Sequence, residues 1–448
     1  MREPNILLDA IIDEARMSHD GLASRVNRLG QRDGLGLLYD HASVRRWIRD
    51  GTIPRGHVPE VICEVLSMRL KRTVTLADIG MDRSGAPSDG PLAKIVEQAT
   101  ALWRIDYKKT ATLRQAVPMD GSAAIAPVFE WENPPDDLDV SRYEGSRVDP
   151  QLVRSLRAAR TRYERMYREA GGIPVRPRVV ALLNDCAAPM MKGSYDDVTG
   201  RQLHRAVGGL TALAGICAYD ADLQGVAQRY FFHALRMAKA SGDRGFGGYV
   251  VALLANQAHY RGLYRQVIQY TETALRGAHG YLSPALITDL STLQAKAYAR
   301  MGDRDGCHAS MHRAEDMAQR IRLNEEPAET GYVQPGLVET QHAEALRCLG
   351  DLSAARRYAE RAVETTSHMR GNVHRLATLA TILAGQGDAE AAAGVAGEMT
   401  DKATGMESCR ISERLIAVRN VILAASDGRV ARELGQRIND ITAVPLRS

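Results

Sequence analysis

The sequence predicts an all-α protein in which a small N-terminal helical domain precedes a long array of helical pairs. Three observations lead to this prediction. Aromatic residues make up only 5% of the chain, and Ala and Leu dominate long stretches, which favours helix over sheet. Apolar residues recur at helical spacing along the first eighty residues. The second half of the chain repeats itself, as proteins built from stacked helical pairs do.

The bulk composition is that of a globular protein. With 448 residues the chain is long enough for two to four ordinary domains. Its net charge of +4 is too small for a general polycation, so any nucleic-acid surface must be local. The six cysteines form no C-x-x-C pair, so we expect neither a disulfide framework nor a standard zinc site. The N-terminus carries acids through its apolar pattern, unlike a signal peptide, and no run is long enough to cross a bilayer. A cytoplasmic protein with no membrane partner is expected.

Residues 5–80 predict a compact unit of four helices. A first apolar stripe runs through Ile6, Leu7, Ala10, Ile11 and Ala15. Ser18 is placed to cap a second helix, and the glycine-containing stretch 29–40 follows it. A third helix falls within residues 41–56. A fourth contains Val58, Val61, Ile62, Val65 and Leu66, and residues 71–81 end the unit.

The third helix, in the segment HASVRRWIRDGTIPRG (41–56), combines an apolar face with arginines. Val44, Trp47 and Ile48 are spaced to face a core, whereas the arginines fall on the other faces. Gly51 and Pro54 then end the helix. Residues 25–55 hold seven arginines against three aspartates, a net of +4, although residues 1–83 as a whole are nearly neutral. An ordinary solvated helix face is the alternative interpretation.

This order of elements is the layout of a helix-turn-helix domain, and it assigns roles to residues if the domain binds DNA. Arg45, Arg46 and Arg49 are the candidates for the major groove, because arginine can bond guanine with two hydrogen bonds. His41 and Ser43 lie at the helix N-terminus, where groove contacts usually start. Phosphate contacts, which position the domain, are expected from Ser18, Arg25 and Arg55. Trp47 is expected in the core.

The proposed division is a DNA-binding domain at 1–82, a linker and connecting helix at 83–148, and helical repeats at 149–448. The linker proper is DRSGAPSDG (82–90), followed by a short connecting helix at 91–103. Prolines make 121–139 look irregular, and glycine and proline interrupt 171–200 in the same way. Residues 149–170 show a helical pattern, but the sequence does not give the structure of 104–200 as a whole.

The repeats are clear from about residue 208, with units beginning near 208, 248, 288, 336 and 373. Three of them share a Gly-Asp pair at the turn, and small or apolar residues follow each glycine after five and twelve positions. The pairs are Gly302-Asp303, Gly350-Asp351 and Gly387-Asp388. The pattern resembles tetratricopeptide repeats, whose period is about 34 residues. Another solenoid of helical pairs is the alternative, and both would form a curved array with a concave groove.

A helix-turn-helix domain joined to such repeats resembles a group of actinobacterial transcriptional regulators implicated in sporulation and antibiotic control. The resemblance is carried by LLDAIIDEARMSHDGLASRVN (7–27), YDHASVRRWIRDGTIPRG (39–56), VTLADIGM (74–81) and the repeat core at 213–243. The architecture is also similar to that of peptide-sensing quorum regulators. The connection before the third helix is longer here than a tight turn, which leaves the docking angle on DNA open.

The tetratricopeptide resemblance implies that the first helix of each pair lines the groove. The residues that would then point inward, as candidates for ligand binding, are Tyr249, Asn256, His259, Lys296, Glu344 and Arg347. Asn, Arg and Lys there could hold a peptide backbone or an acidic group. The alternative is a polar groove that serves only in dimerisation.

Catalytic signatures are missing from the sequence. There is no Walker-type loop and no H-E-x-x-H motif. Cys307, His308 and His312 form the only metal-like group, and the repeat frame makes Cys307 a packing residue, so we expect no metal, no cofactor and no enzyme activity.

The expected function is a cytoplasmic, homodimeric transcriptional regulator that binds double-stranded DNA. Its repeats would mediate dimerisation and sense a peptide, a small molecule or a protein. The alternative is a repeat-based protein scaffold with an accessory N-terminal interaction module. The salt dependence of DNA binding separates the two hypotheses, because contacts to DNA phosphates weaken steeply as the salt concentration rises.

Overall fold

The structure is a computed structural model that describes residues 5–32, 37–54, 58–76, 78–81, 91–109, 111–133, 137, 139–365, 368–426 and 428–442. These residues are mainly helical. Within them the only extended pairings are two isolated bridges, Arg142 with Tyr195 and Arg147 with Ser194, and no strand is formed. The prediction of an all-α protein is therefore confirmed. The linker expected at 82–90 and the phosphate contact expected at Arg55 lie outside the described residues.

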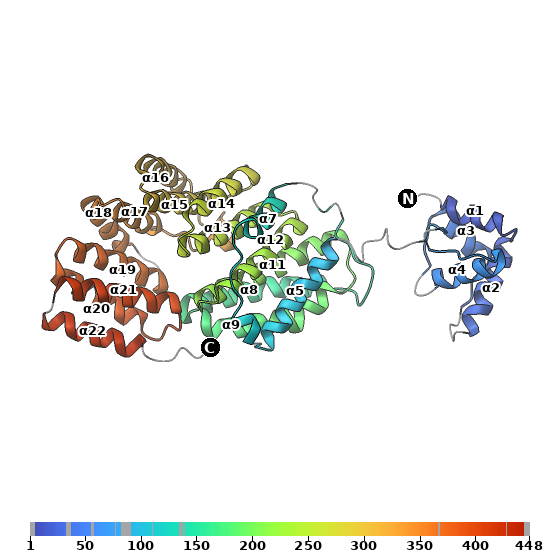
Figure 1. Cartoon of the computed structure of the whole chain (residues 1–448), viewed down its shortest axis with the longest axis horizontal. Helices are drawn as coiled ribbons and strands as arrows, with labels where there is room; N and C mark the ends of the chain where they lie inside the picture. The colour runs from blue at the N-terminus through green and yellow to red at the C-terminus, as the bar shows by residue number, and fades with distance from the viewer. Residues whose placement is uncertain are drawn as a thin grey trace. The chain divides into compact units, whose positions relative to one another are not determined.

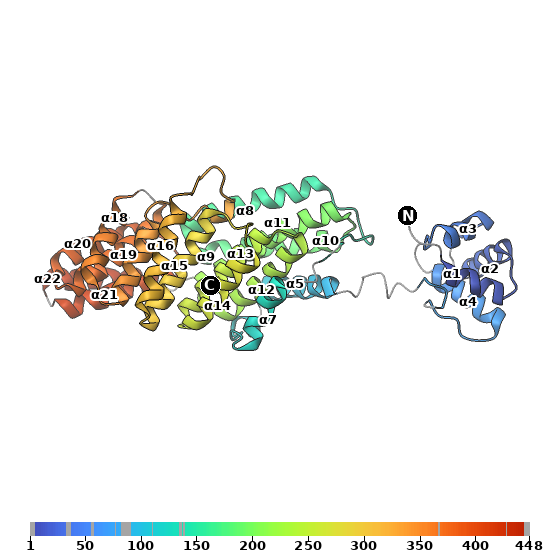
Figure 2. The same cartoon turned by 90° about the horizontal axis from the view of Figure 1, so that it is seen from above.

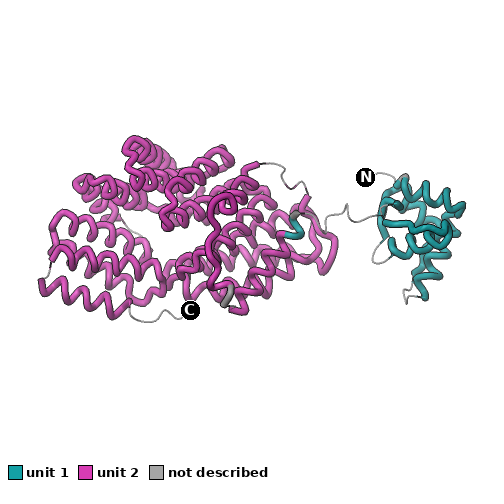
Figure 3. The backbone as a smooth tube through the Cα atoms, viewed as in Figure 1, with its two compact units in different colours: residues 1–94 teal, residues 95–448 magenta. Residues whose placement is uncertain are grey.

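The chain divides into two compact units, residues 1–94 and 95–448 (Figure 3). The boundary falls inside α5 (Pro91–Tyr107). This helix is more than the short connector expected from the sequence, because Val96, Ala99, Leu102 and Trp103 are buried in the core of the second unit.

Unit 1 is built from α1 (Ile6–Glu14), α2 (His19–Arg32), α3 (His41–Arg49) and α4 (Val58–Leu70). Its core contains the predicted apolar residues of the fourth helix, Val58, Val61, Ile62, Val65 and Leu66. The stripe predicted for the first helix was wrong at three positions: Leu7 and Ala10 are exposed and Ile11 is half-buried, because α1 packs on the core through Leu8, Ile12 and Ala15. The two ends of the unit are joined by Asn5, which caps α1 by accepting a hydrogen bond from the Leu8 amide (3.0 Å) and donates one to the Ile79 carbonyl (3.0 Å). The cap predicted at Ser18 is confirmed, since its Oγ accepts a hydrogen bond from the Gly21 amide at 3.1 Å.

Unit 2 begins with α5 and a set of elements that pack around the first helical pair. They are α6 (Ala111–Arg114), α7 (Ser122–Glu132), α8 (Pro150–Ala170), α9 (Gly172–Leu182), the π-helical turn η2 (Leu183–Ala187) and α10 (Ala188–Met191).

Helical pairs follow one another through the rest of unit 2 (Figures 1 and 2). In each pair the two helices pack together, and the second helix packs on the first of the next pair, as in a solenoid. The pairs are α11 (Asp197–Asp220) with α12 (Gln224–Ser241), α13 (Arg244–Tyr260) with α14 (Tyr264–Gly277), α15 (Pro284–Met301) with α16 (Arg304–Ala318), α17 (Leu337–Cys348) with α18 (Leu352–Glu364), α19 (Met369–Gly385) with α20 (Ala389–Ala403), and α21 (Cys409–Ala425) with α22 (Arg429–Thr442). A short helix, η3 (Ala328–Thr330), lies between α16 and α17.

The repeated Gly-Asp pairs explain the turns within the pairs. Gly302, Gly350 and Gly387 adopt left-handed backbone angles, with φ of 77°, 85° and 84°, a conformation that glycine adopts without steric cost. The aspartate that follows each of them caps the next helix by accepting a backbone N–H. The residues five and twelve positions after each glycine are all buried: Cys307, Ala314, Ala355, Ala362, Ala392 and Met399.

Two segments that the sequence predicted as irregular are helical. Residues 122–132 form α7 although Pro127 lies inside it, and residues 172–191 continue through α9, η2 and α10 although Pro177 interrupts the bonding of α9. Packing offsets the cost of these prolines. In α7, Val128 and Trp131 are buried against the pairs.

The array curves until its C-terminal pairs return to α8 and α9 (Figure 1). The Glu407 amide donates to the Ala170 carbonyl at 2.9 Å, and the Ile173 amide donates to the Glu407 carbonyl at 3.4 Å. Gly171, with a φ of 90°, permits this approach, because a Cβ there would collide with the Glu407 carbonyl oxygen. Unit 2 is thus closed by contacts between segments more than 200 positions apart.

Candidate functional site

Helix α3 of unit 1 presents an arginine face. Val44, Trp47 and Ile48 are buried on one side, whereas Arg45, Arg46 and Arg49 are exposed. None of the three arginines forms an ion pair with a residue that the structure describes, and the nearest polar contact is a long hydrogen bond from Arg46 to Ser43 Oγ (3.4 Å). Three guanidinium groups are therefore free to contact an external anion.

The start of α3 is fixed by its cap. Asp40 Oδ1 accepts hydrogen bonds from the Ser43 amide (2.8 Å) and from Ser43 Oγ (2.7 Å). These bonds hold the pKa of the Asp40 carboxyl below its usual range. Beside the cap, the Tyr39 ring meets the Trp47 ring edge-on at 5.0 Å. Trp47 is a core residue, as the sequence predicts.

Asn27 on α2 sets the position of the chain just before α3. Its Oδ1 accepts a hydrogen bond from the Tyr39 amide, and its Nδ2 donates one to the Tyr39 carbonyl, both at 2.8 Å. One side chain thus satisfies both backbone groups of a residue in the connection. This residue was not among the sequence candidates, because no pattern in α2 indicates that its amide reaches a residue twelve positions away.

The remaining candidates of unit 1 lie in different settings. His41 is exposed at the first position of α3, and Arg25 is exposed on α2, where it bonds the Gly21 carbonyl at 3.0 Å. Ser18 is exposed and occupied as a cap. Ser43 is only 7% exposed and donates to Asp40, so its hydroxyl does not contribute to the arginine face.

Unit 2 encloses two adjoining hollows, which together we call the interior cavity. The first, of about 270 Å³, is lined by aliphatic and aromatic side chains of α8, α11, α13 and α17 and by Arg370, His374 and Arg375 of α19. The second, of about 510 Å³, is polar and is lined largely by α13, α15, α17 and α21. Seven residues, among them Tyr167, Asn256, Gln341 and Arg370, line both hollows, which are therefore continuous.

The structure brings together the six groove candidates named from the sequence. Tyr249 lines the apolar hollow, Asn256 lines both, and His259, Lys296, Glu344 and Arg347 line the polar one. Most of the wall comes from the first helix of each pair, as the repeat frame implies. Tyr249 is 3% exposed and so lies deep in the wall.

Two charged candidates differ in their partners. Glu344 is bonded to Arg414 (Nη2–Oε1 2.5 Å) and to Thr378 Oγ1 (3.3 Å). Burial would raise the pKa of Glu344, but Arg414 and Lys296 together outweigh burial and keep the pKa below its usual range. Lys296 is 8% exposed and makes no hydrogen bond or ion pair with any described residue. Burial lowers the pKa of its ammonium, and Glu344 and Asp289 offset part of that effect.

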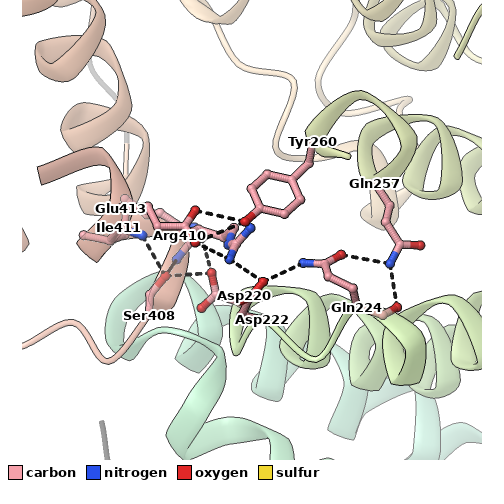
Figure 4. A network of polar contacts seen from close by, with 10 residues as sticks. Asp220, Asp222, Gln224, Gln257, Tyr260, Ser408, Arg410, Ile411 and Glu413 are labelled. Atoms are coloured by element: carbon pink, nitrogen blue, oxygen red, sulfur yellow. Dashed lines mark hydrogen bonds and ion pairs between the residues drawn. The ribbon is translucent and has the colours of Figure 1, made fainter. Parts of the chain in front are cut away.

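A buried polar cluster closes the array beside the cavity (Figure 4). Asp220 is fully buried, pairs with Arg370, and accepts hydrogen bonds from the Gly172 amide and Ser408 Oγ, both at 2.7 Å. We call Gly172, Asp220, Arg370 and Ser408 the clasp, because they join the first pair to the last two.

Arg410 extends the clasp toward the cavity. Its Nη2 lies 2.7 Å from both Asp222 Oδ1 and Glu413 Oε1, and its guanidinium lies 3.8 Å from the centre of the Tyr260 ring. The clasp and Arg410 could not be predicted from the sequence, because Asp220 meets Arg370, and Arg410 meets Asp222, across 150 or more positions, and such contacts leave no local signal.

The structure adds two negative findings. Among the described residues, no group of three or more His, Cys, Asp or Glu side chains is placed to hold a metal ion. Cys307 is a buried packing residue, separate from the exposed His312. In the same part of the chain, no helix is both long and apolar enough to cross a membrane.

Residues 8–82 match the family described as the SP15 N-terminal domain, a segment that coincides with the four helices of unit 1 and covers less than half of the chain. No curated protein matches the sequence.

Proposed function

We propose that this protein is a DNA-binding transcriptional regulator. Unit 1 would bind an operator through α3, with Arg45, Arg46 and Arg49 in the major groove and Arg25 on the phosphate backbone. Unit 2 would be a tetratricopeptide-like array that mediates homodimerisation and senses an effector. The setting would be the cytoplasm.

The observation that carries the proposal is the arginine face of α3. Burial of Val44, Trp47 and Ile48 fixes the helix to the core, and the exposed arginines have no acidic partner among the described residues. A surface helix whose cations serve only solubility usually carries interspersed acids as well, and α3 has none between His41 and Arg49. Such a local basic face is what binding to phosphates and guanine edges requires.

The repeat array supports a role in assembly and sensing. A single helix-turn-helix unit makes few base contacts, and paired units on half-sites one helical turn apart add to affinity. The interior cavity, lined by polar side chains of successive pairs, offers a place for an effector.

The test is recovery of genomic DNA with the tagged full-length protein, followed by a mobility shift on the strongest site at two salt concentrations. We expect a palindromic site whose affinity falls at least about tenfold between 50 and 200 mM salt, because bound phosphates release counterions. The double variant Arg45→Ala/Arg46→Ala should abolish the shift.

The matched control is Arg429→Ala/Arg432→Ala, which removes two exposed arginines from α22 and should leave binding unchanged. If both double variants bind DNA like the parent protein, α3 is not the recognition helix. If no DNA is enriched, the alternative of a protein scaffold with an accessory N-terminal module replaces the proposal.

A further inference from the structure

We propose that the interior cavity of unit 2 binds a small amphipathic organic anion. Its acidic group would lie against Lys296, Arg300 and Arg347, and its apolar body would lie among Leu213, Ile216 and Leu253. The inference rests on the proposed function only for the sensing role of this ligand. The binding site itself is argued from the cavity.

The first step is the excess of positive charge around the polar hollow. Among the described residues, only two carboxylates, Glu344 and Glu413, line the polar hollow. The cationic side chains that line it number six: Lys296, Arg300, Arg347, Arg370, Arg410 and Arg414. Ion pairs neutralise three of these, since Arg370 is bonded to Asp220, Arg410 to Asp222 and Glu413, and Arg414 to Glu344. The other three form no ion pair with a described residue.

The second step is the burial of Lys296. A buried charged group is costly unless it is paired and hydrogen-bonded. The Lys296 side chain is 8% exposed and makes no hydrogen bond or ion pair with a described residue, and Glu344 and Asp289 act on it only through their charge. The neighbouring carboxylate, Glu344, already accepts bonds from Arg414 and Thr378. An incoming anion would supply the missing partner. Arg300 lies one helical turn further along α15, and Arg347 lies on α17, which packs against α15.

Two further polar atoms in the same wall could each form a hydrogen bond that they lack. His259 Nε2 and Gln341 Oε1 are buried and have no hydrogen-bond partner among the described residues. Buried polar atoms in folded proteins are normally satisfied, so unsatisfied atoms lining a cavity indicate a ligand or water that completes them. Burial lowers the pKa of His259 to about 3, so its ring is neutral and adds no further charge.

The adjoining hollow determines the rest of the ligand. Leu213, Ile216, Phe231, Leu253 and Leu337 line it together with several tyrosines, a surface suited to an aliphatic or aromatic body. The arginines in the same lining already have partners: Arg168 pairs with Glu164, Arg370 pairs with Asp220, and Arg375 bonds backbone carbonyls. The polar hollow of about 510 Å³ falls in the size range of small-molecule sites, roughly 300–1,000 Å³, and the apolar hollow of about 270 Å³ extends it. One cavity with an apolar end and a cationic end fits a single amphipathic acid better than a helix or a folded partner.

The experiment compares two fluorescent probes on the full-length protein. Anilinonaphthalene sulfonate has an aromatic body and one anionic group, and phenylnaphthylamine has a similar body without the charge. We expect saturable binding of both, with the sulfonate bound more tightly. Lys296→Met should weaken sulfonate binding by about tenfold to a hundredfold, the effect of losing a charged hydrogen bond, and leave phenylnaphthylamine binding unchanged.

Two controls keep the test decisive. Lys192→Met removes an exposed lysine of the same unit and should change neither affinity. Arg347→Gln repeats the test at a less buried position, so a folding defect in one variant does not leave the outcome open. Lys296→Met itself should fold, because Lys296 makes no hydrogen bond or ion pair with a described residue and Glu344 keeps its bonds to Arg414 and Thr378.

Three outcomes would overturn the inference: no saturable binding of the sulfonate, equal affinity for both probes, or sulfonate affinity unchanged in Lys296→Met and Arg347→Gln. The mobility shift on DNA is measured on the same preparations. Selective sulfonate binding without any DNA site supports the cavity and contradicts the regulator. A salt-sensitive DNA site without selective sulfonate binding supports the regulator and contradicts the proposed cavity ligand.

Discussion

The two units of this chain use arginine in opposite ways. In unit 1, Arg45, Arg46 and Arg49 are exposed on a helix whose other face is buried, and no described acid pairs with them. In unit 2, Arg370 and Arg410 are 7% and 6% exposed and are held by carboxylates from distant segments of the chain. The difference shows that the role of an arginine is set by what surrounds it in the fold. An exposed unpaired arginine is available to a partner, whereas a buried paired one holds segments together.

The largest expected effect comes from breaking the clasp. Asp220→Asn leaves Arg370 buried without its charge partner, which should lower the free energy of unfolding of unit 2 by about 3–5 kcal/mol. Urea unfolding measures this in a Trp47→Phe background, where the fluorescence comes from Trp103 and Trp131, both in unit 2.

A surface ion pair provides the control for the clasp. Glu433→Gln breaks the exposed pair with Arg429 and should cost at most about 1 kcal/mol. If Asp220→Asn costs no more than this control, the clasp does not hold the array closed, and the contrast between the units fails for Arg370.

The second prediction is that the stability of the two units depends differently on pH. Burial lowers the pKa of His204, His233 and His368 to about 4, and all three belong to unit 2. In His204, Nδ1 donates to the Gly200 carbonyl at 2.7 Å and Nε2 is buried without a partner in the described part of the chain. A folded-state pKa below the unfolded value means that the unfolded chain takes up protons first as pH falls. Stability is therefore full above about pH 6.5 and is lost toward pH 4.

For His204 alone the loss should reach about 3 kcal/mol, at 1.36 kcal/mol per pKa unit. Of the histidines that the structure describes in unit 1, His41 is exposed and His19 is half-buried, so unit 1 should keep its stability over the same range. Urea midpoints at several pH values measure this, with Trp47 reporting on unit 1 and Trp103 and Trp131 on unit 2. A His204→Gln variant should flatten the pH dependence of unit 2, and an unchanged slope would contradict the assignment.

The comparison also shows which features could be predicted from sequence. Local periodicity predicted α3 and its two faces, and the Gly-Asp pairs at 302, 350 and 387 predicted turns that recur with the same left-handed geometry. The repeat frame then brought Lys296 and Glu344 to one cavity. Packing between distant segments left no such signal. The helix α7 could not be predicted around Pro127, because its stability depends on the burial of Trp131 against the helical pairs. The contact between Asp220 and Ser408 could not be predicted either.

The third prediction concerns Asn27, which ties the connection to α2. Asn27→Ala removes two hydrogen bonds to Tyr39 and should destabilise the start of α3 by about 1–3 kcal/mol. Amide hydrogen exchange at residues 39–49 should become faster. DNA affinity should fall although no arginine is changed. Gln31→Ala, an exposed substitution on the same helix, is the control, and equal exchange rates in the two variants would show that Asn27 does not position α3.

The smallest effect is expected on the stability of unit 1 itself. The triple variant Arg45→Ala/Arg46→Ala/Arg49→Ala should change its free energy of unfolding by no more than about 0.5 kcal/mol, as exposed substitutions usually do. The only described contact that it loses is the 3.4 Å bond from Arg46 to Ser43, and alanine has a high helix propensity. Unfolding followed through Trp47, beneath the arginine face, measures the change. A loss above about 1 kcal/mol would place these arginines among the structural residues, as in unit 2, and the reason for assigning them to an external partner would disappear.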